Sequence, residues 1–199
     1  MQAAAVAPKF VLLEEFLFPD ELTGVLEHSL SREADFHSGT VVSEGDAYAV
    51  DPEHRRGRLL FDAGPYHRLV TDRIRACFGW AMERLQHESF AIADIDSEIA
   101  ASNDGDFFLP HRDNSDPACS SREISYVYYF YRDPKPFSGG ELRIYEEGSW
   151  EHDVIVPLQN RLVFFRSWSI HEVAQVQCAS RDFADSRFAL NGWIHCERR

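Results

Sequence analysis

Residues 123–131, with the sequence EISYVYYFY, form a short run of aromatic and β-branched residues of the kind that builds buried β-strands. Similar short runs recur after about residue 93, and turn-forming residues such as Asp133-Pro134 and Ser138-Gly139-Gly140 separate several of them. These runs cover residues 95–102, 141–145, 154–157, 161–165, 172–176 and 188–194. Many short strands without intervening helices predict a barrel or a double-sheet jelly roll.

The first half of the chain has a different pattern. Residues 10–18 are apolar enough for a strand, and Pro19 then begins a predicted helix with an apolar stripe. A second helix is predicted over residues 65–87, where apolar residues recur at helical spacing. A length of 199 residues suits one domain. We therefore expect a mainly β fold with flanking helices, in which residues 1–93 form a helical support region and residues 94–199 form the β core of a single domain.

Charge and composition exclude several classes of protein. The net charge of −13 disfavours general binding to a phosphate backbone, so no nucleic-acid partner is expected. The short basic run Arg55-Arg56-Gly57-Arg58 is interpreted as a solvated turn, with a local basic binding patch as the alternative. No stretch is long and apolar enough for a membrane span, and residues 1–9 do not have the pattern of a secretory signal. The four cysteines form no C-x-x-C pair and are expected to be reduced, so a cytoplasmic location is predicted.

Three residues have the pattern of a metal site. His111 and Asp113 lie two residues apart, so both side chains leave the same face if this stretch is extended. His171 lies 58 residues after Asp113, at the start of a predicted strand that could return to the first pair. Two histidines and one carboxylate on one face of an iron(II) ion leave three positions for a chelating co-substrate and dioxygen. Each histidine alone could also be an ordinary core or surface residue.

Several motifs in order make the signal specific. His111-Arg112-Asp113-Asn114 is followed by the strand around Tyr129, by Ser138-Gly139-Gly140-Glu141-Leu142, and by residues 160–165. His171-Glu172-Val173 and the stretch from Arg187 to Trp193 complete the set. In this order, residues 99–195 resemble the catalytic core of the iron(II)- and 2-oxoglutarate-dependent oxygenases, in the prolyl 4-hydroxylase-like branch. The resemblance implies a double-stranded β-helix with iron held by His111, Asp113 and His171 at its open mouth.

The resemblance also implies roles for residues around the metal. Arg187 matches the residue that pairs with the distal carboxylate of 2-oxoglutarate, a role that suits the two-pronged guanidinium group. Arg181 is a competitor for this role in the same neighbourhood. Tyr129 matches a tyrosine that donates a hydrogen bond to the same carboxylate, although core packing explains an aromatic strand equally well. Trp193 is expected to have a structural role in the core. The implied cofactors are Fe(2+), 2-oxoglutarate and O2, with ascorbate as an accessory reductant.

Two departures and one open question accompany the resemblance. Residues 177–186 have loop composition and lengthen the segment between His171 and Arg187, which either shapes substrate choice or extends a solvated turn. The stretch 102–106 lacks a tyrosine that relatives often have there. Halogenating relatives have a small residue in place of this carboxylate, so the presence of Asp113 implies hydroxylation rather than halogenation. The substrate stays open between a prolyl residue of a peptide or protein and a free amino acid or other small molecule, and the alternative to an enzyme is a non-catalytic metal- and 2-oxoglutarate-binding module.

Overall fold

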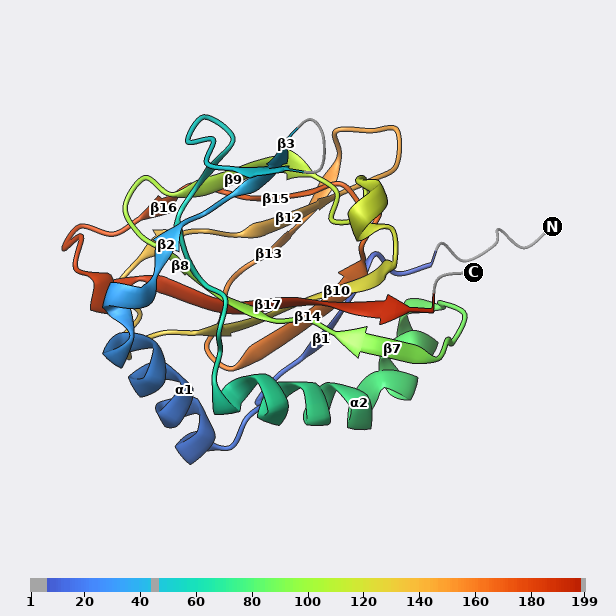
Figure 1. Ribbon diagram of the computed structural model, residues 1–199, viewed down its shortest axis with the longest axis horizontal. Coiled ribbons are helices and arrows are strands. Elements are labelled where there is room, and N and C mark those ends of the chain that lie inside the picture. Colours follow the sequence, from blue (N-terminus) through green and yellow to red (C-terminus); the bar gives the residue numbers. More distant parts are fainter. Residues whose placement is uncertain (1–6, 44–46, 198–199) are drawn as a thin grey trace.

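Two antiparallel sheets face each other in the computed structural model, which describes residues 7–43 and 47–197 (Figure 1). Residues 1–6, within the segment where the sequence predicts no secretory signal, lie outside the described residues. The helices lie on the far side of the larger sheet from the smaller sheet. The arrangement is a double-stranded β-helix of the jelly-roll type, which confirms the predicted fold class.

The larger sheet has eight strands. Their order is β1 (Phe10–Leu13), β14 (Arg161–Arg166), β10 (Arg122–Phe130), β17 (Arg187–Cys196), β8 (Glu98–Ser102), β6 (Arg58–Leu60) and β2 (His37–Ser38), with β7 (Ile92–Ile95) also paired to β17. The long strands β10 and β17 lie at its centre and pair along most of their length. β10 carries Tyr129 and β17 begins at Arg187, whereas His111 and His171 belong to the smaller sheet.

The smaller sheet has five strands. Their order is β13 (His152–Ile155), β12 (Leu142–Tyr145), β15 (His171–Val173), β9 (Phe107–His111) and β5 (Arg55–Arg56). Two short pairs flank the sheets, β11 (Ser138–Gly139) with β16 (Val176–Gln177) and β3 (Val41–Ser43) with β4 (Ala47–Ala49). Most predicted strand runs are confirmed within a few residues, but β9 and the short strands between residues 37 and 60 are absent from the sequence prediction.

Two helices cover the outer face of the larger sheet, α1 (Pro19–Ser31) and α2 (Pro65–Leu85). Each begins at a proline, which suits the first turn because its missing N–H needs no partner there. α2 ends where Gln86 takes a left-handed conformation. Its apolar stripe packs on the sheet, as predicted, through Val70, Ile74, Phe78, Ala81, Met82 and Leu85. Neither helix combines the length and hydrophobicity that a bilayer crossing requires.

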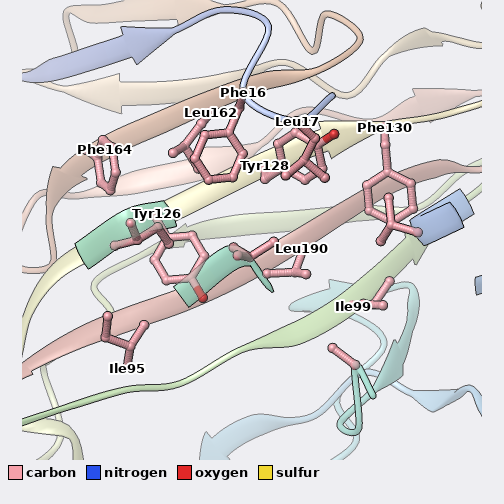
Figure 2. Packing of buried hydrophobic residues seen from close by; sticks show 14 of the residues in the cluster. Phe16, Leu17, Ile95, Ile99, Tyr126, Tyr128, Phe130, Leu162, Phe164 and Leu190 are labelled. Atoms are coloured by element: carbon pink, nitrogen blue, oxygen red, sulfur yellow. The ribbon is translucent and has the colours of Figure 1, made fainter. Parts of the chain in front are cut away.

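Strand β10 separates two cores. Tyr126, Tyr128 and Phe130 point into the cluster between the larger sheet and the helices, where Figure 2 shows them near Leu190. Tyr129 belongs instead to the cluster between the two sheets. Because side chains alternate along a strand, this register assigns the tyrosines that the sequence alone left open. Of the four tyrosines in this run, Tyr129 is the one that belongs to the hydrophobic cluster between the sheets, against which Val127 also packs.

Residues before position 94 contribute more than helices. β1, within the predicted strand at residues 10–18, extends the larger sheet together with β2 and β6, and β5 extends the smaller one. The helical support region expected over residues 1–93 therefore also contributes strands to both sheets. The chain crosses from the smaller to the larger sheet at Gly57, whose φ of 145° is disfavoured for other residues. Arg55 is mostly buried there, with a side-chain exposure of 15%. The interpretation of this basic run as a solvated turn was therefore wrong for Arg55.

We expect Gly139→Ala to lower the free energy of unfolding by more than about 2 kcal/mol, because a left-handed residue and an overpacked contact each cost about 1–2 kcal/mol. Gly139 has a φ of 70°, and an added Cβ would lie 2.2 Å from the carbonyl oxygen of Gln175. Gly148 is the matched control, since its φ is 73° and an added Cβ would have no neighbour within 4 Å. Urea unfolding measures both variants, and equal losses would contradict the expected clash.

Candidate metal centre and adjoining cavity

The two candidate histidines are brought together by strand pairing. His171 begins β15 and His111 ends β9, and the two residues are direct partners in the antiparallel register of these strands. Their ring centroids lie 4.2 Å apart. Partners in an antiparallel pair project to the same face of the sheet, so both imidazoles point toward the space between the sheets.

Asp113 completes the cluster from just beyond β9. Its backbone N–H donates to the carbonyl oxygen of Ser167 at 3.0 Å, which ties this segment to the end of β14. Asp113 Oδ1 lies 3.6 Å from His111 Nε2, and Asp113 Oδ2 lies 3.5 Å from His171 Nε2. The three side chains offer ligand atoms that all lie within 4.8 Å of one another. This donor set of two imidazoles and one carboxylate is suited to iron(II) with open coordination positions.

Hydrogen bonds set the orientation of both imidazole rings. His111 Nδ1 lies 2.8 Å from the carbonyl oxygen of Leu109, and His171 Nδ1 lies 2.9 Å from the carbonyl oxygen of Ser169. A carbonyl oxygen can only accept, so each Nδ1 carries a proton and Nε2 is the nitrogen through which each neutral ring would bind a metal ion. Phe108 adds a stacking contact to His111, with ring centroids 3.6 Å apart. Both Nε2 atoms are therefore held ready to bind a metal ion.

Burial and neighbouring groups favour the protonation states that a metal requires. Burial, together with His111, lowers the pKa of His171 to about 4, so its ring is neutral near pH 7. Burial alone raises the pKa of Asp113, but His171, His111 and a hydrogen bond from Ser125 outweigh it and hold the pKa below the usual range. Asp113 is thus a carboxylate and His171 a neutral imidazole, as metal ligands must be.

Arg187 lies in the same cavity, at the start of β17. Its side chain is buried, and its guanidinium carbon lies 4.8 Å from the centre of the Tyr129 ring. Arg187 Nε and the Tyr129 hydroxyl are both buried without a hydrogen-bond partner among the described residues. Burial raises the pKa of Tyr129, so its hydroxyl keeps its proton and can donate. Two orphaned donors are unusual in an interior and fit a carboxylate ligand between them.

The competing arginine lies outside this cavity. Arg181 is 79% exposed at its side chain and pairs with Asp104 at 3.0 Å. The whole loop 177–186 is described, and none of it lines the metal cavity or the groove that adjoins it. Of the two arginines, Arg187 is therefore the one placed to meet a ligand beside His111, Asp113 and His171.

The inner cavity opens to a wide groove. The cavity that contains His171 and Arg187 has a volume of about 80 Å³, and the adjoining groove has a volume of about 1220 Å³. Residues that line both spaces are Arg55, Glu98, Phe108, His111, Asp113 and Trp193. A ligand in the groove would therefore lie directly against the metal cluster.

Four residues at this junction had no role at the metal site in the sequence prediction: Arg55, Glu98, Phe108 and Trp193. Arg55 pairs with Glu98 at 3.2 Å and lies over the ring of Phe108. Trp193 was expected in the core, which was wrong, because it is half-buried on the cavity side of β17 with the guanidinium of Arg122 over its ring. The run Arg55-Arg56-Gly57-Arg58 could have indicated a basic binding site. Its position beside the cavity follows only from the passage of the chain between the two sheets at Gly57.

Comparisons with known proteins agree with this geometry. The family model described as the 2OG-Fe(II) oxygenase superfamily matches residues 97–195, about half of the chain. A protein from Synechocystis described as an uncharacterized PKHD-type hydroxylase is 32% identical over 192 residues, covering 92% of this chain. The chain spans 61% of the length of that relative.

Solved structures share the fold. A prolyl-4-hydroxylase from Pseudomonas putida superposes with a TM-score of 0.71 at 18% identity, covering 96% of this chain and 94% of the other. A prolyl hydroxylase from Trichoplax adhaerens, in complex with a peptide fragment of the hypoxia inducible factor oxygen degradation domain, has a TM-score of 0.68 at 19% identity, with coverage of 94% and 83%. The segment that matches the family model contains all three clustered side chains, His111, Asp113 and His171. The chain belongs to the 2OG-Fe(II) oxygenase superfamily.

Proposed function

We propose that this protein is an iron(II)- and 2-oxoglutarate-dependent hydroxylase in which His111, Asp113 and His171 hold the metal. The observation that carries the proposal is the convergence of three ligand atoms within 4.8 Å, in one cavity with a buried, unpaired arginine Nε. Family membership supports Fe(2+), 2-oxoglutarate and O2 as the cofactor and co-substrates. Together they would supply an oxidant able to hydroxylate an unactivated C–H bond, with succinate and carbon dioxide as the other products.

The protein's own residues would bind and orient the co-substrate. Arg187 presents a guanidinium fork and Tyr129 a hydroxyl donor to the distal carboxylate of 2-oxoglutarate. Their burial excludes water from this pair, which strengthens the interaction with a carboxylate. Gly140 supports this arrangement because an added Cβ there would lie 2.6 Å from Arg187 Cδ. The glycine therefore keeps the path of the arginine side chain free.

For the substrate, we propose a prolyl residue within a peptide or protein. The groove beside the metal cluster has a volume of about 1220 Å³, which exceeds the roughly 300–1,000 Å³ of a typical small-molecule pocket. A free amino acid would leave most of this groove empty. The solved relatives described as prolyl hydroxylases, one of them with a bound peptide, point in the same direction, although their low identity shows only the shared fold. The four cysteines, none of them in a disulfide, support the further proposal of a cytoplasmic location.

The test is iron(II)-dependent conversion of 2-oxoglutarate to succinate by the purified protein. We expect slow turnover without substrate and faster turnover with one or more members of a panel of proline-containing peptides. Free proline, tested at matched concentration, should stimulate less. Stimulation by free proline alone would contradict the peptide substrate. Binding of metal and 2-oxoglutarate without any succinate would instead identify a non-catalytic binding module.

A further inference from the structure

Ser125 lies on the cavity side of β10, where packing of the hydrophobic core does not explain a serine. Ser125 has an exposure of 2%, and it shares its face of the strand with Val127 and Tyr129. The opposite face carries the large aromatic residues that fill the core. A serine in this position makes fewer apolar contacts than a larger residue would. Its buried hydroxyl also costs free energy unless it is hydrogen-bonded. Its partner is therefore the clue to its role.

That partner is the carboxylate of Asp113. Ser125 Oγ donates to Asp113 Oδ2 at 2.5 Å, since a carboxylate can only accept. A second buried hydroxyl, Ser167 Oγ, lies 2.9 Å from Ser125 Oγ. Because the proton of Ser125 is committed to Asp113, the hydroxyl of Ser167 must be the donor to Ser125. The result is a directed chain from Ser167 through Ser125 to Asp113.

The same two serines hold Asp113 at both its backbone and its side chain. The carbonyl oxygen of Ser167 accepts the backbone N–H of Asp113 at 3.0 Å, while Ser125 engages Oδ2. A carboxylate can bind a metal ion through one oxygen or through both. The hydrogen bond from Ser125 occupies one lone pair of Oδ2, which favours Oδ1 as the oxygen that contacts the metal. A single-oxygen contact also keeps free a position that a chelating co-substrate and dioxygen need.

We propose that Ser125 is a positioning residue that holds Asp113 as a single-oxygen metal ligand, with Ser167 fixing the direction of the Ser125 hydroxyl. This inference rests on the proposed function, because it assumes that Asp113 binds the metal. Residues that hydrogen-bond to metal ligands commonly change metal affinity 10–100-fold when removed. The alternative is that Ser125 and Ser167 only stabilise the fold at the end of β10 and β14.

The experiment is a calorimetric titration of the metal-free full chain with Mn(II). We expect Ser125→Ala to raise the Kd for Mn(II) by about 10-fold or more, and Ser167→Ala to raise it by a smaller factor. Ser125→Thr keeps the hydroxyl and should restore the Kd to within about 3-fold of the parent, well inside the effect of losing the hydrogen bond. Ser29→Ala is the matched control, because Ser29 is equally buried but bonds to the carbonyl oxygen of Val25 within α1.

A purely structural role gives a different pattern. The melting temperature of the metal-free protein would then fall for both Ser125→Ala and Ser29→Ala. Both variants would keep the parental Kd for Mn(II). An unchanged or lowered Kd in Ser125→Ala would overturn the positioning role and leave the proposed function standing. A parent protein that binds no Mn(II) would overturn the proposed function itself and this inference with it. The two failures are therefore distinguishable in one series of titrations.

Discussion

Replacing Asp113 with alanine should abolish stabilisation of the protein by Mn(II). Asp113 supplies the only carboxylate of the three-residue ligand cluster found among the described residues, and its ligand atom lies within 4.8 Å of both histidine nitrogens. In the parent, Mn(II) at about 100 times its Kd should stabilise the fold by about 2.7 kcal/mol. The variant keeps both imidazole side chains but lacks the negative charge that draws a divalent cation. A thermal melt with and without Mn(II) measures the difference.

The same variant should lose conversion of 2-oxoglutarate to succinate. Asp72→Ala is a matched control, because Asp72 lies on α2 with 64% of its side chain exposed and forms only a weak surface pair with Arg68 at 3.6 Å. We expect the control to keep both the Mn(II) shift and succinate formation. A full Mn(II) shift in Asp113→Ala would remove Asp113 from the ligand set, and His171→Ala would then show whether any of the cluster binds metal.

Arg187→Ala should raise the 2-oxoglutarate concentration needed for half-maximal turnover by about 30-fold or more. Loss of one partner of a buried, hydrogen-bonded charge pair costs about 2–5 kcal/mol, and each 1.4 kcal/mol is a factor of ten. Arg187 is buried beside Tyr129 with an unpaired Nε, so its loss removes a buried cationic donor from this part of the cavity. The affinity for Mn(II) alone should stay near the parental value, because Arg187 is not in the ligand cluster.

Arg181→Ala provides the control for this prediction. It removes the same type of side chain from the loop before β17, but Arg181 is 79% exposed and pairs with Asp104. Its half-saturation for 2-oxoglutarate should match the parent. Arg187→Lys separates charge from shape, because lysine keeps the charge but not the two-pronged donor, and should fall between the parent and Arg187→Ala. Equal half-saturation in the parent and Arg187→Ala would exclude this residue from co-substrate binding.

Much of the site could be predicted because its signals are local. His111 and Asp113 lie two residues apart, His171 begins a short predicted strand, and Arg187 begins a long β-rich stretch. The strand prediction worked for β10, β14 and β17 because their apolar and aromatic residues are continuous. It failed for β9, which contains Pro110 and has few buried side chains, so its strand conformation depends on pairing with neighbours rather than on its own composition.

The sequence by itself predicted a mainly β fold, either a barrel or a jelly roll, together with the apolar stripe of α2 and the order of the motifs, because composition and short-range periodicity record these directly. The resemblance of the ordered motifs then implied the double-stranded β-helix. Only the tertiary structure decided which residues meet. The pairing of His111 with His171, the cavity face of Tyr129 and the contact of Ser125 with Asp113 all depend on strand register. A shift of one residue in that register would turn each side chain to the other face, and only packing of the whole core fixes it.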